Sequence, residues 1–113
     1  MGSFSTSESH SSRWHQPVRV PIRKQDVFGS AREMCDDLES WKILGVDEEA
    51  LTITCERAGG FLAGTAKIVV SVSGPDGIPS SETNVRSETD GGLLSKDKAI
   101  VTEFVKKFSM RVI

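Results

Sequence analysis

Apolar and polar residues alternate in five stretches of the chain, and this two-residue period is typical of strands with one buried face. The clearest stretch is residues 65–73, in which Ala66, Ile68, Val70 and Val72 share one side. Prolines at positions 17 and 21 remove backbone donors, so the first stretch fits a strand at a sheet edge. The other four stretches are residues 17–23, 41–47, 51–57 and 82–89.

A helical period of three and four residues occurs in residues 24–40 and 95–108. Each stretch has an apolar stripe on one face and charged residues on the opposite face. Ser95 is placed to cap the start of the second helix. The first stripe consists of Val27, Phe28, Ala31, Met34, Cys35, Leu38 and Trp41, and the second of Ile100, Val101, Phe104, Val105 and Phe108.

The resulting order β-α-β-β-β-β-α predicts an α+β fold with a single antiparallel five-stranded sheet. Residues 47–50 and the Gly- and Pro-rich residues 74–80 are short connections typical of hairpins. Both helices are expected on one face of the sheet, while the other face contacts water. The covered face should carry Ile53, Cys55, Ile68, Val70 and Val72.

Residues 17–113 are expected to form a single α+β domain, because a chain of 113 residues suffices for one core but leaves no room for a second. Residues 1–16 are expected to be a disordered, serine-rich tail. Serine occupies half of positions 1–12, and Phe4 is the only sizeable apolar residue there. Little burial would therefore offset the entropy of ordering this segment.

Two glycine-rich loops contain the candidate residues for binding a ligand or a partner. If the strands run up and down, residues 59–64 and 90–95 fall at the same end of the sheet. The large apolar residues beside the glycines at that end have two possible roles. They either fold back and cover the open end of the space between the sheet and the helices, or form an exposed patch that binds a partner or a ligand. The last helix begins there, and its free amides favour an anion. The candidate residues are Gly60, Phe61, Leu62, Gly91, Gly92, Leu93 and Leu94.

The charge balance argues against nucleic acid as a partner. The net charge is −2 and the pI is about 5.7, whereas a nucleic-acid binder needs a basic stripe that neutralises phosphates. Lys96, Lys98, Lys106 and Lys107 share the last helix, where a solvated outer face is the ordinary interpretation. The chain contains no stretch of the ~20 apolar residues that a transmembrane segment needs. Two cysteines without a secretory signal favour a reducing, cytoplasmic location.

The sequence contains no catalytic or metal-binding constellation, which predicts a protein without enzyme activity, metal or cofactor. His10 and His15 are the only histidines, and both lie in or beside the predicted tail, away from any pocket wall. Cys35 and Cys55 fall on apolar faces without an adjacent base, which favours buried structural thiols over nucleophiles.

The pattern resembles the helix-grip or TATA-binding-protein-like topology, in which a curved antiparallel sheet wraps a long C-terminal helix. Over residues 17–108 it is similar to small bacterial domains of unknown function. Larger helix-grip proteins hold lipids, sterols or polyketides between sheet and helix, so the resemblance implies binding of an apolar small molecule as one role. This chain lacks the length and the additional short helices that widen such a cavity. The residues that carry the resemblance are Trp41, Val46, Asp47, residues 86–89, Gly91, Gly92 and residues 98–108.

Two functional hypotheses remain. The first is a non-enzymatic interaction or accessory domain that binds a protein partner or a second copy of itself. The second is a small protein of helix-grip type that binds an apolar, lipid-like ligand. An enzyme ranks third, because no residues with catalytic roles can be named.

Overall fold

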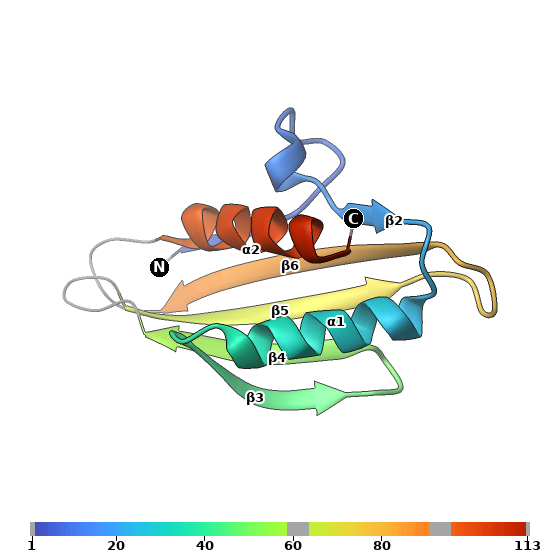
Figure 1. The fold of residues 1–113 in the computed structure, drawn as a ribbon. Helices are drawn as coiled ribbons and strands as arrows, with labels where there is room; N and C mark the ends of the chain where they lie inside the picture. The colour runs from blue at the N-terminus through green and yellow to red at the C-terminus, as the bar shows by residue number, and fades with distance from the viewer. Residues whose placement is uncertain (1, 59–63, 91–95, 113) are drawn as a thin grey trace.

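The structure, a computed structural model, describes residues 2–58, 64–90 and 96–112. Within these ranges it contains six strands, two α-helices and one short 3-10 helix (Figure 1). In chain order the elements are β1 (Gly2–Ser5), η1 (Arg13–His15), β2 (Val18–Val20), α1 (Lys24–Asp37), β3 (Trp41–Asp47), β4 (Thr52–Ala58), β5 (Thr65–Ser73), β6 (Ser81–Asp90) and α2 (Asp97–Val112).

The strands form one antiparallel sheet in the order β1-β6-β5-β4-β3, and β2 also pairs with β6. Figure 1 shows both helices on the same side of the sheet, where α1 contacts β3, β4 and β5 and α2 contacts β6 and β1. This arrangement confirms the predicted α+β class and the predicted placement of both helices on one face. The observed order is β-β-α-β-β-β-β-α, because a sixth strand, β1, precedes the five that were predicted.

The N-terminal segment differs from the expected disordered tail. β1 pairs with β6 from Gly2↔Thr89 to Ser5↔Arg86, and β2 pairs nearer the start of the same strand. β6 is ten residues long, whereas β2 has only three. β2 alone would leave much of this edge with unpaired amides and carbonyls. β1 pairs with the remaining part of β6, and the backbone hydrogen bonds of this pairing order the serine-rich segment.

The core lies between the inner face of the sheet and the two helices, as the periods predict. Ile53 and Ile68 have no exposed surface, and Phe104 and Phe108 are at most 1% exposed. The rings of these two phenylalanines stack with centroids 5.4 Å apart, and Trp41 stacks on Phe104 at 5.7 Å. An aromatic column therefore connects β3 to α2 through the core.

Helix α1 ends earlier than predicted, and α2 continues further. Trp41, which the spacing placed on the first helical stripe and the alternation placed in the strand of residues 41–47, is the first residue of β3. The chain leaves α1 at Leu38, whose N–H donates to the carbonyl of Met34, and the N–H of Trp41 then donates to the carbonyl of Leu38. These bonds turn the chain into the sheet. Helix α2 runs from Asp97 to Val112 and so passes the predicted end at residue 108.

The uncovered face of the sheet is polar, as predicted. One row across four strands alternates in charge, with Lys42 opposite Glu56, Glu56 opposite Lys67, and Lys67 opposite Glu88. Opposite charges on neighbouring strands stabilise a sheet by roughly 0.2–1 kcal/mol per pair. The stability that these pairs give the sheet is a sufficient reason for the row.

Candidate functional site

The outer face of α2 carries a cluster of cations. Lys98, Thr102, Lys106 and Met110 follow one another at steps of four and form one outward-facing row. The side chain of Met110 is 83% exposed. A hollow of about 700 Å³ runs along this face. Its lining comes from α2 and the residue before it: Lys96, Lys98, Ala99, Thr102, Glu103, Lys106 and Lys107.

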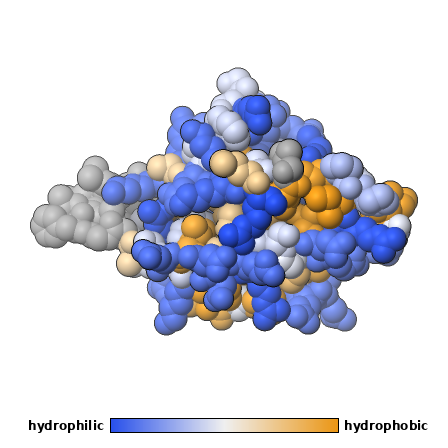
Figure 2. Space-filling view, in the orientation of Figure 1, coloured by the Kyte–Doolittle hydropathy of each residue, from blue (hydrophilic) through white to orange (hydrophobic). Residues whose placement is uncertain are grey.

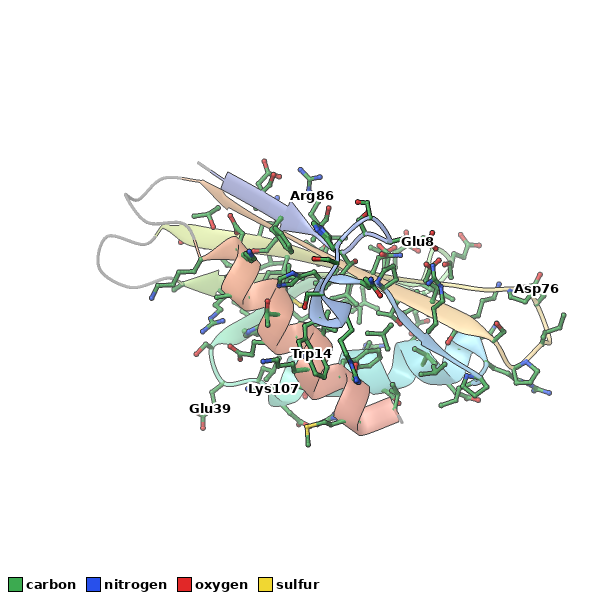
Figure 3. The ribbon with its side chains drawn as sticks, turned by 90° about the horizontal axis from the view of Figure 1, so that it is seen from above. Glu8, Trp14, Glu39, Asp76, Arg86 and Lys107 are labelled. Carbon is green, nitrogen blue, oxygen red and sulfur yellow. The ribbon has the colours of Figure 1, made fainter. Side chains whose placement is uncertain are left out.

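The 3-10 helix η1 packs against α2 and enlarges the cluster. Trp14 lies beside α2 (Figure 3), with the Nζ of Lys106 5.5 Å from the ring centroid and the guanidinium carbon of Arg13 4.4 Å from it. The face of an indole ring attracts such cations through its quadrupole. Trp14 also packs against the hydrophobic core. We refer to the surface formed by Arg13, Trp14, Lys96, Lys98, Lys106 and Lys107 as the basic face.

Most of the charge on the basic face is not neutralised by the protein itself. Of its five cations, all except Lys107 lack an ion pair within the described residues. The carboxylate that lines the hollow, Glu103, is already bound twice. Its Oε1 is 3.0 Å from the Nζ of Lys107, and its Oε2 is 3.4 Å from the Nη1 of Arg57. The face is therefore positive in a chain whose net charge is −2.

Both histidines lie beside the basic face rather than in a tail. The ring of Phe4 stacks on His10 at 4.8 Å and meets His15 edge-on at 5.1 Å. The Nε2 of His15 is 2.9 Å from the hydroxyl of Thr102 on α2. Partial burial and the nearby ammonium of Lys98 lower the pKa of His15. This ring is therefore neutral at pH 7 and holds the N-terminal segment on α2 without adding charge.

The loop residues that the sequence singled out lie outside the described residues, as does the predicted helix cap Ser95. The strands that flank the loops meet at one end of the sheet, because Ala58 pairs with Thr65 and Thr65 pairs with Asp90. The binding role of the loop residues stays a prediction. They are Gly60, Phe61, Leu62, Gly91, Gly92, Leu93 and Leu94.

A buried carboxyl group lies at the start of α2, and it was not identified from the sequence. Asp97 is 2% exposed. Its Oδ1 accepts hydrogen bonds from the hydroxyls of Ser87 and Thr89 on β6, each at 2.6 Å. A carboxylate in the first turn of a helix is also favoured by the helix dipole. This cluster fixes the start of α2 against β6 and thereby positions Lys96 and Lys98.

The two cysteines are buried thiols. Cys35 on α1 and Cys55 on β4 have no exposed surface. The hydrogen bond to Cys55 and burial both raise the pKa of Cys35. Its thiol is therefore protonated at neutral pH, which is the unreactive form.

The described ranges contain neither a metal-binding cluster nor a membrane-spanning helix. In residues 2–58, 64–90 and 96–112, no group of three or more histidine, cysteine, aspartate or glutamate side chains could hold a metal ion. In the same ranges, no helix is long and apolar enough to cross a membrane. The basic face is the arrangement that these residues offer most clearly for binding.

Among solved structures, the chain is similar to the crystal structure of Ara h 8.0201, with a TM-score of 0.51 and 12% sequence identity. The aligned region covers 96% of this chain and 97% of that one. The chain has a helix-grip-like fold. At this identity the likeness establishes the fold alone. No family model and no curated protein sequence matches the chain.

Sequence reasoning found four members of the basic face in this helix-grip-like fold and missed two. It assigned the lysines of the last helix to a solvated surface, and it assigned Arg13 and Trp14 to the disordered tail. Trp14 itself was a usable indication, because a large aromatic residue rarely lies in a segment with nothing to pack against. The contact between η1 and α2 joins distant parts of the chain, and no local pattern predicts it.

Proposed function

We propose that the chain is a non-enzymatic interaction or accessory domain that binds an anionic partner through the basic face. The observation that carries the proposal is the unneutralised charge. Four exposed cations without an ion pair in the described residues share one surface with Trp14. A partner of opposite charge would supply the counterions that the protein does not. The proposal retains the cytoplasmic location predicted from the sequence.

The distribution of charge over the helical side supports an anionic partner. Helix α1 presents acids to solvent, since Asp26, Glu33, Asp36 and Asp37 are all exposed. Cations concentrated on one face of a net negative chain both attract an anion and orient the domain as it approaches. Such binding weakens with salt, because the Debye length falls from about 10 Å at 0.1 M to about 3 Å at 1 M ionic strength.

Charge reversal on the basic face should weaken binding of a polyanion. We expect Lys98→Glu combined with Lys106→Glu to weaken binding of poly-L-glutamate by at least about tenfold at low salt, because two attractive charges become repulsive. Fluorescence anisotropy of labelled poly-L-glutamate measures the affinity. Backbone amide chemical shifts in NMR spectra identify the surface that is bound, and we expect the largest changes in η1 and α2.

The matched control reverses two cations that lie off the basic face. Arg23 is exposed before α1, and the side chain of Arg86 is 55% exposed on the uncovered face of the sheet (Figure 3). Arg23→Glu combined with Arg86→Glu gives the same net charge as the test variant and should leave the affinity nearly unchanged. Equal weakening by both double variants, or shift changes centred on the sheet face, would contradict the proposal.

Binding of an apolar small molecule, the helix-grip role, is the second candidate, and one observation favours it. The indole Nε1 of Trp41 and the hydroxyls of Ser81 and Thr83 are buried without a hydrogen-bond partner among the described residues. A buried polar group without a partner costs about 1–3 kcal/mol. A polar atom on an otherwise apolar ligand would satisfy such a group. Trp41 pairs with Arg57 near the end of the sheet where β4 stops, so a ligand entering there would reach it.

Native mass spectrometry of the purified full chain separates the two candidates. If the second is correct, a small molecule remains bound and its removal changes the emission of Trp41. The variant Trp14→Phe makes that emission specific, because the chain has only two tryptophans. We expect the bare protein mass and unchanged emission after delipidation, which would exclude the second candidate.

A further inference from the structure

The described residues that line the hollow on the basic face all belong to α2 or directly precede it. Partner peptides usually dock in grooves between two elements or add a strand to a sheet edge. Figures 1 and 3 show α2 and η1 together on one side of the sheet, with the helix presented outward. A helix face that presents its cations outward in this way suits a broad, continuous surface.

The kind of cation on the basic face also favours a broad surface. Four of its five cations are lysines. A lysine ammonium is a hydrated point charge on a flexible stem, whereas fixed recognition of a carboxylate or phosphate uses the planar fork of arginine. Flexible point charges fit a surface whose anions move laterally. Each lysine near an anionic lipid surface strengthens binding about fivefold.

Apolar groups accompany the cations on the same side of the molecule. Met110 is 83% exposed and continues the row that contains Lys98 and Lys106. Trp14 has an amphipathic indole, which is a side chain favoured at the boundary between lipid headgroups and acyl chains. Figure 2, viewed from the direction of Figure 1, shows hydrophobic spots between hydrophilic residues on the helical side. Met110 therefore places an apolar side chain beside the cations, where the interfacial layer of a bilayer could bury it.

We infer that the basic face docks this domain on phospholipid bilayers rich in anionic lipid. The inference rests on the proposed function and names its partner. The cations contact headgroup phosphates, and Met110 enters the interfacial layer. The anionic bilayer repels the acids exposed on α1, so the domain contacts the bilayer through α2. Asp37, at the boundary between the two helices, is bound by Arg111 at 3.1 Å.

Vesicle binding by the full chain tests the inference. Vesicles of pure phosphatidylcholine are compared with vesicles in which about a third of the lipid is phosphatidylglycerol. We expect sedimentation with the anionic vesicles only, and release when salt rises from about 0.1 M to about 0.5 M. Lys98→Glu combined with Lys106→Glu should weaken this binding by at least about 25-fold. The control pair Arg23→Glu and Arg86→Glu should bind nearly as the unmodified chain does.

Met110→Ser separates a bilayer from other anionic partners. The variant should weaken binding to anionic vesicles and leave binding to poly-L-glutamate unchanged, because it removes no charge. If poly-L-glutamate binds through the basic face and anionic vesicles do not, the inference fails while the proposed function stands, and an acidic polypeptide becomes the partner. If neither binds, both fail. Unchanged melting temperatures establish that the variants are folded, since each replaced side chain is exposed.

Discussion

Replacing Phe104 with alanine should lower the free energy of unfolding by about 3–5 kcal/mol. Phe104 is 1% exposed and stacks on Trp41 and Phe108, so its removal leaves a cavity between two rings that belong to different elements. The surrounding side chains can fill such a space only in part. Urea unfolding followed by circular dichroism measures the loss.

The variant Phe104→Leu provides the comparison for that experiment, since leucine keeps most of the buried apolar volume. Phe104→Leu should lower the free energy of unfolding clearly less than Phe104→Ala does. A loss below about 1 kcal/mol for Phe104→Ala would place the residue outside a packed core and contradict the aromatic column.

Replacing Asp97 with alanine should cost about 2–4 kcal/mol of stability. The substitution leaves the hydroxyls of Ser87 and Thr89 buried without their acceptor, and an unsatisfied buried group costs about 1–3 kcal/mol. It also removes an acid from the first turn of α2. Thermal and urea unfolding give the change in stability, and amide exchange in the first turn of α2 reports local opening.

Two further variants separate the hydrogen bonds of Asp97 from its other effects. Asp97→Asn keeps an oxygen acceptor at the same position and should cost less than alanine. Thr89→Val combined with Asp97→Ala should cost less than the sum of the two single changes, because both remove the same bond. Strict additivity would show that the bond between them contributes nothing.

The sheet could be predicted from the sequence because its strands have a simple local pattern. Every second residue from Ala66 to Val72 is apolar, and the structure has a strand over residues 65–73 in which these positions are buried. The alternation of residues 41–47 likewise predicted β3 with its observed bounds, whereas the helical period wrongly included Trp41 in the first helical stripe. The alternation rule failed for β1, because serines carry little preference for a strand. Pairing with β6, rather than its own composition, orders that segment.

The basic face could be predicted only in part, for a different physical reason. The spacing of Lys98 and Lys106 fixes them on one outward row, so a helical period is enough to find them. Arg13 and Trp14 join them through tertiary packing of η1 on α2, which no short window of sequence contains. The burial of Asp97 also depends on packing between elements, because the hydroxyls of Ser87 and Thr89 on β6 donate to its carboxylate.

β6 pairs with both N-terminal strands, β1 and β2, and this affects the order in which the strands of the sheet can pair during synthesis. β1 and β2 leave the ribosome first, whereas β6 is the last of the six strands to be made. The contact from Thr6 to Asn84 spans 78 residues, so it closes a long loop, whereas neighbouring strands such as β3 and β4 need only a short turn. We therefore expect the N-terminal strands to join last. Until they do, a chain whose other strands are already paired exposes the edge of β6 to pairing with other chains.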